Sequence, residues 1–137
     1  MNQPRCTVDV IVHDDADRIL LIERKNPPHG WALPGGFVDP GEDLTTAVRR
    51  EAAEETGLAL ADLFQFATYS APDRDPRGHT ISTVYVARPS GTAEAASDAK
   101  GLAWLPLADL PTTAFDHGAI LADYRRFLET GERPRLP

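Results

Sequence analysis

Three glutamates near the middle of the chain have the type and spacing to bind a divalent cation. Glu51 and Glu55 are four residues apart, and Glu51 and Glu54 are three apart, so a helix would place all three carboxylates on one patch of its surface. Like charges at that distance repel one another unless they share a hard cation such as Mg²⁺ or Mn²⁺. The alternative is a solvated acidic face on which Arg50 forms an ion pair with Glu54. Helical spacing alone leaves both interpretations open.

A helix is predicted to carry these glutamates. Asp43 is a suitable N-cap residue, Gly57 followed by Leu58 fits a glycine stop, and small or apolar residues recur at helical spacing between them. Gly35 and Gly36 precede the helix, and their backbone can approach a bound ion closely because neither carries a side chain. The sequence therefore predicts a glycine loop, whose carbonyl could reach a bound ion, followed by a helix that bears carboxylates.

The order of residues from Gly36 onward is more specific than the glutamate cluster. Gly36, five residues, Glu42, seven residues and then REAAEETGL from Arg50 match the Nudix box at every specified position, with the small Ala52 at an aliphatic position. The chain therefore resembles the Nudix hydrolase family. The resemblance implies an α/β (α+β) fold, an α/β/α sandwich with a mixed central β-sheet, as a single domain over residues 1–137. It also implies hydrolysis of a nucleoside diphosphate linked to another moiety.

The resemblance further implies roles for individual residues. Glu51, Glu54 and Glu55 would bind the metal, which we expect to be Mg²⁺, with Mn²⁺ as an alternative. Gly36 would lend a backbone carbonyl, and Arg50 would hold the glutamates by ion pairing. Cations on the pyrophosphate oxygens neutralise charge that repels a nucleophile and lower the pKa of bound water. We therefore expect water near Glu54 to attack one phosphorus atom.

Residues 73–79 (DRDPRGH) form a second informative stretch. The segment is similar to one in the small archaeal and bacterial ADP-ribose pyrophosphatases, as are AWLPLADLP and AFDHGAIL further along the chain. Arg74 or Arg77 could pair bidentately with a substrate phosphate. Alternatively, the two arginines pair with Asp73 and Asp75 and fix the turn. His79 is interpreted as a structural histidine.

Further candidates lie outside these two stretches. Arg24 follows a predicted strand, where it either contacts phosphate or is a solvated strand end. Ser97-Asp98-Ala99 resembles a paired-acidic stretch of the ADP-ribose enzymes in which only the second acid is present here. Asp98 is therefore a candidate substrate-binding residue, and either Asp98 or Glu94 is a candidate acidic helper from outside the box. The alternative for both is an acidic loop residue in water.

The preferred activity is hydrolysis of ADP-ribose, a nucleotide-sugar substrate, to AMP and ribose 5-phosphate. A MutT-like hydrolase of nucleoside triphosphates such as 8-oxo-dGTP shares the same box and is the first alternative. A non-catalytic domain that senses ADP-ribose is the second. Because similar ADP-ribose enzymes are commonly homodimers, the resemblance implies a homodimer as well.

The rest of the chain predicts the elements around the box. The patterns favour strands at 7–12, 19–22, 63–69 and 80–86, the first two as a hairpin, and an amphipathic helix at 115–128. Asp116 is a candidate cap of that helix, and His117 is given no catalytic role. The aromatic residues, which are predicted to pack in the core, are Trp31, Phe64, Tyr69 and Trp104.

Composition excludes several function classes. A formal charge of −7 without a basic stripe argues against binding nucleic acid through its phosphates. No apolar run approaches the ~20 residues of a membrane helix, and no signal-peptide pattern opens the chain. The single cysteine, Cys6, lies in an alternating apolar segment and is predicted to be a buried, inert thiol. A reducing, cytoplasmic compartment is the resulting expectation.

Overall fold

The computed structural model describes residues 3–90 and 101–136. Strands and helices alternate along these residues in an α+β arrangement. In chain order the elements are β1 (Arg5–Val12), β2 (Arg18–Arg24), β3 (Gly30–Ala32), β4 (Gly35–Phe37), α1 (Leu44–Thr56), β5 (Ala59–Tyr69), β6 (Thr80–Ser90), β7 (Leu102–Pro106) and α2 (His117–Thr130).

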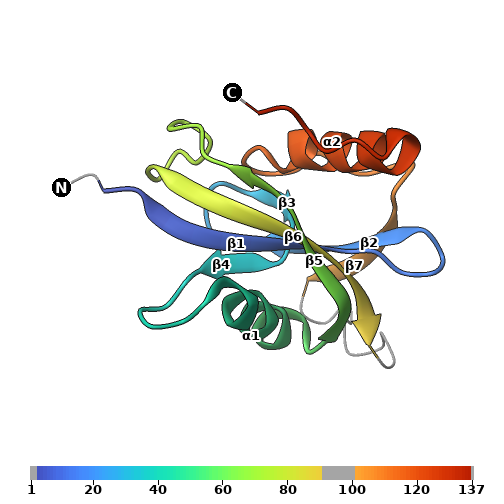
Figure 1. The fold of residues 1–137 in the computed structure, drawn as a ribbon, viewed down its shortest axis with the longest axis horizontal. Coiled ribbons are helices and arrows are strands. Elements are labelled where there is room, and N and C mark those ends of the chain that lie inside the picture. Colours follow the sequence, from blue (N-terminus) through green and yellow to red (C-terminus); the bar gives the residue numbers. More distant parts are fainter. Residues whose placement is uncertain (1–2, 91–100, 137) are drawn as a thin grey trace.

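The strands form two sheets between the two helices. The larger sheet has the order β4-β1-β6-β5 and is mixed, because β1 runs parallel to β6 and antiparallel to β4. The smaller sheet is antiparallel with the order β3-β2-β7. Figure 1 shows α1 and α2 on opposite sides of these strands. The predicted α/β/α sandwich with a mixed sheet is confirmed.

Strand β1 lies at the centre and faces both helices. Val8, Val10 and Val12 pack in the hydrophobic cluster that includes α1, whereas Ile11 packs in the cluster that includes α2. Because successive side chains of a strand point to opposite faces, Asp9 lies on the α2 side with Ile11. The strand thus places one carboxylate inside an otherwise apolar layer.

Helix α1 forms as the sequence predicts. The Asp43 side chain accepts a hydrogen bond from the Thr46 N–H at 2.8 Å, which satisfies one of the free donors at the helix start. Gly57 ends the helix with φ of 74°, a left-handed conformation that glycine adopts without strain. Ala47, Val48 and Ala52 are fully buried against the strands, so these residues anchor the helix that carries the glutamates.

The predicted hairpin is only partly correct. An isolated antiparallel bridge between His13 and Ile19 closes the turn, but β1 then joins the larger sheet and β2 the smaller one. The alternation of side chains cannot show that β1 and β2 enter different sheets, since both strands are buried whether they share one sheet or not. The later predicted strands are present and longer than expected, as β5 and β6.

Two burial predictions are wrong. Cys6 is exposed because it lies at the start of β1, before the buried part of the strand. Phe64 is 38% exposed because it lies on an outward position of β5, where its ring contacts Phe127 and the Arg133 guanidinium rather than the interior. The other three aromatics pack in or against the two clusters.

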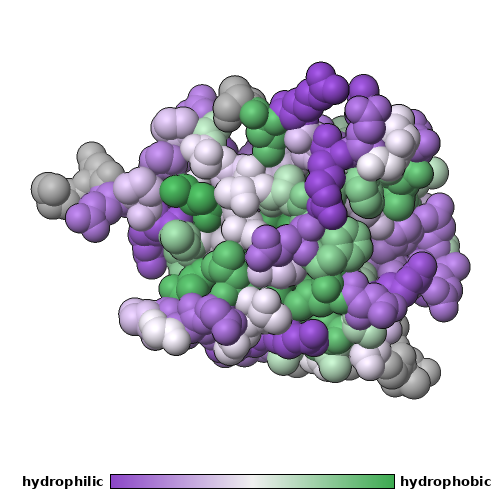
Figure 2. Space-filling view, in the orientation of Figure 1, coloured by the Kyte–Doolittle hydropathy of each residue, from purple (hydrophilic) through white to green (hydrophobic). Residues whose placement is uncertain are grey.

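The surface reflects the layered arrangement. Figure 2 shows hydrophobic residues across the middle of this face, between more hydrophilic regions around α1 below and α2 above. Within the described residues, neither helix is long and apolar enough to cross a lipid bilayer.

Candidate active site

The predicted glycine loop is a short strand, β4, because Gly35 and Gly36 pair with β1, and the carboxylates of α1 face these two glycines. The Gly35 N–H donates to Glu55 Oε1 at 2.8 Å. Glu51 lies against Gly36 so closely that a Cβ at this position would come within 2.0 Å of Glu51 Oε2. Only glycine permits this approach, so the loop sequence and the helix spacing together fix the position of both carboxylates.

Arg50 holds the loop and the glutamates together. Its Nε and Nη2 donate to the two carboxylate oxygens of Glu42 at 2.6 and 2.9 Å, and Nη2 also donates to the Phe37 carbonyl at 3.1 Å. Its Nη1 donates to Glu54 at 3.0 Å and lies 3.5 Å from Glu51. The predicted pairing of Arg50 with the glutamates is present. Arg50 also forms the ion pair with Glu54 that was the alternative interpretation, and it binds the backbone through the Phe37 carbonyl.

The site contains two kinds of carboxyl group, which differ in the direction of their pKa shift. Hydrogen bonds from Arg50 lower the pKa of Glu42 to about 2, so Glu42 stays charged and acts as the partner of Arg50. Burial, with the nearby charge of Glu51, raises the pKa of Glu55 to about 7. Burial also raises the pKa of Glu51. Arg50 and the Gly35 N–H compensate the negative charge of Glu51 and Glu55 only in part, and a cation would supply the rest.

The donor set fits a hard divalent cation. Glu51, Glu54, Glu55 and the Gly36 carbonyl offer only oxygen ligands, which Mg²⁺ and Mn²⁺ prefer. Among residues 3–90 and 101–136, however, no three acidic, histidine or cysteine side chains converge closely enough to hold an ion as they stand. Arg50 draws Glu54 outward, where its side chain is 60% exposed, while Glu51 and Glu55 face the loop. A cation would have to draw Glu54 inward.

A pocket of about 160 Å³ opens beside Glu55, and we call it the central pocket. Its volume suits one group the size of a sugar rather than a whole dinucleotide. A second hollow of about 540 Å³, the outer pocket, shares Phe37, Asp75, Arg77 and Thr80 with it. The central pocket is lined by Thr7, Asp9, Ile22, Arg24, Ala32, Leu33, Gly35, Gly36, Phe37, Glu55, Arg74, Asp75, Arg77, Thr80, Phe115 and His117.

Two of the predicted phosphate-binding arginines lie at the mouth of the central pocket. The guanidinium groups of Arg24 and Arg77 lie 4.8 and 5.2 Å from the centre of the Phe115 ring, within the range of cation–π attraction. Phe115 has φ of 56°, an uncommon backbone conformation for a bulky residue and one that often marks a functional site. The pocket mouth therefore presents two cations close to one aromatic ring.

For Arg77, the alternative interpretation, an ion pair with Asp75 that fixes the turn, is present in the structure. Its Nε and Nη2 donate to Asp75, whose side chain is 4% exposed. The Arg77 side chain itself is 46% exposed, so it retains a solvent-facing side. His79 has the structural role that was expected, through a hydrogen bond between Nε2 and the Ser70 carbonyl.

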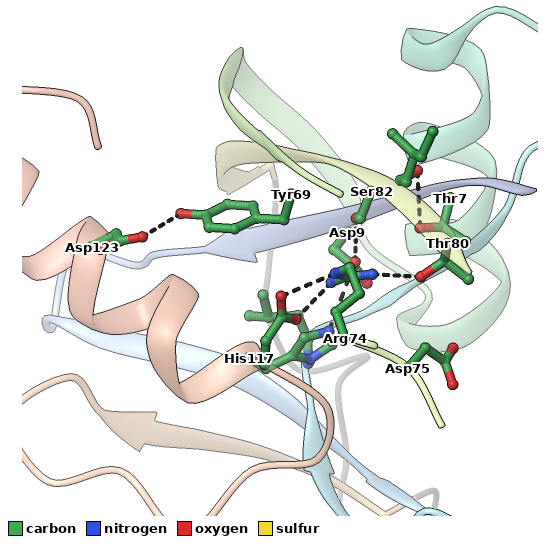
Figure 3. Close-up of polar contacts among 12 residues, drawn as sticks. Thr7, Asp9, Tyr69, Arg74, Asp75, Thr80, Ser82, His117 and Asp123 are labelled. Atoms are coloured by element: carbon green, nitrogen blue, oxygen red, sulfur yellow. Dashed lines mark hydrogen bonds and ion pairs between the residues drawn. The ribbon is translucent and has the colours of Figure 1, made fainter. Parts of the chain in front are cut away.

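Arg74 is placed differently from Arg77. Its Nη2 and Nε donate to the two oxygens of Asp116 at 2.6 and 3.0 Å, and its Nη1 donates to Thr80 Oγ1 at 2.7 Å (Figure 3). The side chain is 4% exposed. Contact with a substrate phosphate stays a prediction for Arg74, but the protein already occupies its donors.

The same ion pair corrects a prediction for α2. Asp116 occupies the N-cap position, but its side chain makes no capping hydrogen bond because both oxygens accept from Arg74. The helix also begins at His117 rather than Phe115. Asp116 therefore joins the loop at 73–79 to the start of α2 instead of capping the helix.

Sequence reasoning assigned nothing to two residues of the central pocket, Asp9 and His117. Burial raises the pKa of Asp9 to about 7 and lowers the pKa of His117 to about 4. A carboxylate in the middle of an apolar strand was the one available signal for Asp9. His117 gave no signal, because its position depends on how α2 packs. The remaining candidates, Glu94 and Asp98, lie outside the described residues.

Known proteins match this chain in sequence and in fold. The NUDIX domain model matches residues 3–124. The chain is 47% identical over 127 residues to an ADP-ribose pyrophosphatase of Methanocaldococcus jannaschii, covering 90% of this chain and 75% of that protein. It is 37% identical over 103 residues to a putative 8-oxo-dGTP diphosphatase of Bacillus subtilis, covering 74% of this chain and 66% of that protein.

A solved structure shows the same fold. The NUDIX domain of Shewanella oneidensis NrtR, determined with ADP ribose, superimposes with a TM-score of 0.78 at 32% identity, over 93% of this chain and 90% of that chain. The family match covers most of the sequence, the Nudix box is intact, and the relative of 47% identity is an enzyme of the family. The chain belongs to the Nudix family and is a Nudix hydrolase.

Proposed function

We propose that this hydrolase cleaves the pyrophosphate bond of ADP-ribose and releases AMP and ribose 5-phosphate. Water adds across the P–O–P linkage, so that its oxygen bonds to one phosphorus and the bridging oxygen leaves with the other. The observation that carries the proposal is the central pocket, which sets buried carboxyls beside two arginines. Similarity to the Methanocaldococcus jannaschii enzyme supports the choice of ADP-ribose.

The metal we propose is Mg²⁺, with Mn²⁺ as a substitute, held by Glu51, Glu54, Glu55 and the Gly36 carbonyl. When bound, the cation neutralises pyrophosphate charge and makes bound water more acidic. Hydrogen bonds from the described residues engage only Oε1 of Glu54, so its second oxygen can accept a proton from the attacking water. Arg50 holds that carboxylate outward, so Glu54 would have to turn inward when the cation binds.

Substrate phosphates are anions, and the central pocket offers Arg24 and Arg77 to them. Arg24 is half-buried, with its Nε tied to the Pro28 carbonyl at 2.8 Å, which leaves its two Nη groups for a ligand. A guanidinium pairs well with two phosphate oxygens at once. We therefore propose that the diphosphate lies between the α1 carboxylates and the two arginines at the pocket mouth.

A substrate panel tests the proposal. ADP-ribose, NADH, nucleoside triphosphates and 8-oxo-dGTP are incubated with Mg²⁺ and with EDTA, and the products are separated by chromatography. We expect AMP and ribose 5-phosphate from ADP-ribose in the presence of Mg²⁺ alone. Glu54→Gln and Glu55→Gln should lower turnover by roughly 10²–10⁴-fold, while the exposed Glu129→Gln on α2 should not change it. Wild-type turnover by folded Glu54→Gln and Glu55→Gln would refute the assignment.

The same panel separates two other functions. Similarity to the Bacillus subtilis protein favours a triphosphate substrate, and a clear preference for 8-oxo-dGTP would select it. Similarity to the NrtR domain favours a sensor of ADP-ribose, and tight ADP-ribose binding without turnover would select that. The intact box and the charge of −7 favour catalysis. A homodimer, a cytoplasmic location and the absence of nucleic-acid binding stay predictions.

A further inference from the structure

The inner wall of the central pocket carries two polar side chains that do not belong to the Nudix box. Asp9 comes from β1 and His117 from the first turn of α2, and they are 8% and 3% exposed. Figure 3 shows the His117 ring pointing toward Asp9. The distance from His117 Nε2 to Asp9 Oδ2 is 3.8 Å, too long for a hydrogen bond. Each side chain has one partner within the protein and a second polar atom at the pocket wall, so a ligand could pair with both remaining atoms.

His117 presents a fixed hydrogen-bond donor to the pocket. Its Nδ1 accepts from the Leu33 N–H at 3.0 Å. A backbone N–H can only donate, so Nδ1 must be unprotonated and the neutral ring carries its proton on Nε2. Nε2 makes no hydrogen bond to any residue within 3–90 or 101–136. The contact with Leu33 therefore sets both the tautomer and the direction of the donor.

Asp9 presents an acceptor beside that donor. Its Oδ2 accepts from the fully buried Ser82 hydroxyl at 2.5 Å. Its Oδ1 lies against Gly35, where a Cβ would come within 2.3 Å of it, and it accepts no hydrogen bond from the described part of the chain. Gly35 also donates to Glu55. Gly35 thus lies between the Asp9 acceptor and Glu55, one of the carboxylates proposed to hold the metal.

A hydroxyl group can satisfy this pair with a single atom. A hydroxyl donates and accepts at once, so one oxygen can bind Asp9 and His117 together, whichever protonation state Asp9 has. A phosphate would place its charge against the carboxylate, and an apolar group would leave both side chains unsatisfied. A ligand that displaces water here must reproduce both hydrogen bonds.

We propose that Asp9 and His117 form a hydroxyl-binding subsite for the sugar attached to the nucleoside diphosphate. This inference rests on the proposed pyrophosphate hydrolysis, to which it adds the recognition of the second sugar. Asp9 and His117 are then specificity-determining residues, since a substrate without a hydroxyl at this position loses two buried hydrogen bonds.

Variants of His117 test the donor separately from the fold. Asn in His117→Asn can place its carbonyl oxygen near the Nδ1 position and keep the bond from Leu33, but it lacks a donor at Nε2. Gln in His117→Gln reaches further and restores an N–H near that position. Asp9→Asn alters the acceptor, and Tyr69→Phe is the control, because the Tyr69 hydroxyl bonds Asp123 outside the pocket.

The kinetic test compares two substrates that share the ADP moiety. We expect His117→Asn and Asp9→Asn to lower kcat/KM for ADP-ribose by roughly 10–100-fold, mainly through KM. Neither should change kcat/KM for ADP esterified with methanol, which lacks the second sugar. His117→Gln should recover part of the loss, and Tyr69→Phe should match the wild type. An equal loss on both substrates, or no loss on either, would overturn the subsite.

A binding test works without turnover. Ribose 5-phosphate is titrated into ¹⁵N-labelled protein without metal, and the Nε2 resonance of His117 is followed by NMR, with inorganic phosphate as the control titrant. The subsite predicts a shift with ribose 5-phosphate only, which Asp9→Asn weakens. This shift in a protein that does not cleave ADP-ribose would support the subsite and refute the proposed function. Cleavage of ADP-ribose with no such shift would refute the subsite alone.

Discussion

Removing the Arg74 guanidinium should destabilise the fold rather than weaken substrate binding. Arg74→Met keeps the apolar stem and deletes the charged group. Two hydrogen bonds to Asp116 and one to Thr80 are lost with it. The change leaves one carboxylate without its partner at the junction between the 73–79 loop and α2.

The magnitude follows from the burial of the two partners. Breaking a buried ion pair by removing one member costs about 3–5 kcal/mol, because the remaining charge is buried without compensation. The Arg74 side chain is 4% exposed, but that of Asp116 is 24% exposed, so water can solvate part of the remaining charge. We therefore expect a loss of about 3 kcal/mol in unfolding free energy, which corresponds to a fall in Tm of roughly 10 °C for a domain of this size.

Urea unfolding followed by circular dichroism measures this loss, and Arg88→Met is the matched control. The side chains of Arg88 and its partner Asp15 are 50% and 98% exposed, so this pair should contribute less than about 1 kcal/mol. If Arg74→Met unfolds at the same urea concentration as Arg88→Met and the wild type, the structural role given to Arg74 is wrong.

Three further changes test other parts of the site. Gly36→Ala should reduce Mg²⁺-dependent turnover at least about 10-fold with little loss of stability, because its Cβ meets only the movable Glu51 carboxylate. Gly35→Ala should cost more than about 3 kcal/mol in thermal unfolding, because its Cβ would lie 2.1 Å from the backbone oxygen of Val8. Burial lowers the pKa of His117 from 6.5 to about 4, so the unfolded chain takes up this proton first and the contribution of His117 to stability should fall by up to about 3 kcal/mol as the pH drops from 6.5 to 4. Asp9 and Glu55, whose pKa values are raised to about 7, act in the opposite direction in the wild type and in the variant alike. The difference in unfolding free energy between the wild type and His117→Asn should therefore change over that range, and a constant difference would contradict the burial argument.

The parts of the molecule that depend on neighbouring residues were predictable from the sequence. The Asp43 cap, the Gly57 stop and the spacing of Glu51 and Glu55 all act within a few residues. The structure confirms the cap and the stop, and it places both glutamates against Gly35 and Gly36. Local propensity and the local hydrogen bonds agree here, so the sequence pattern was sufficient.

Predictions failed where a distant residue competes for a side chain. Asp116 has the type and position of an N-cap, but Arg74, 42 residues earlier, takes both of its oxygens. A bidentate pair with a guanidinium is stronger than one capping hydrogen bond. Cys6 follows an alternating pattern, but β1 is buried on both faces from Thr7 onward, so alternation carries no information about which residue faces water.

The central pocket is the extreme case of this dependence on distant residues. The groups that would hold the metal come from one continuous stretch, 36–55, whereas Asp9, Arg77 and His117 come from three separate parts of the chain. Their positions depend on the pairing of β1 with β6 and on the tie between Arg74 and Asp116. A motif can therefore identify how the bond is cut but not which group is attached to the diphosphate.

This division explains how relatives with one chemistry can differ in substrate. The chain is similar both to an ADP-ribose pyrophosphatase and to a putative 8-oxo-dGTP diphosphatase, and under the proposed function a substitution at Asp9, His117 or Phe115 would alter the pocket wall without replacing a residue of the box. The converse also holds, since a change in the box should affect every substrate by a similar factor. Substrate choice in this fold is therefore a property of the strand, the loop and the helix start that meet at the pocket, and each can change independently of the catalytic helix.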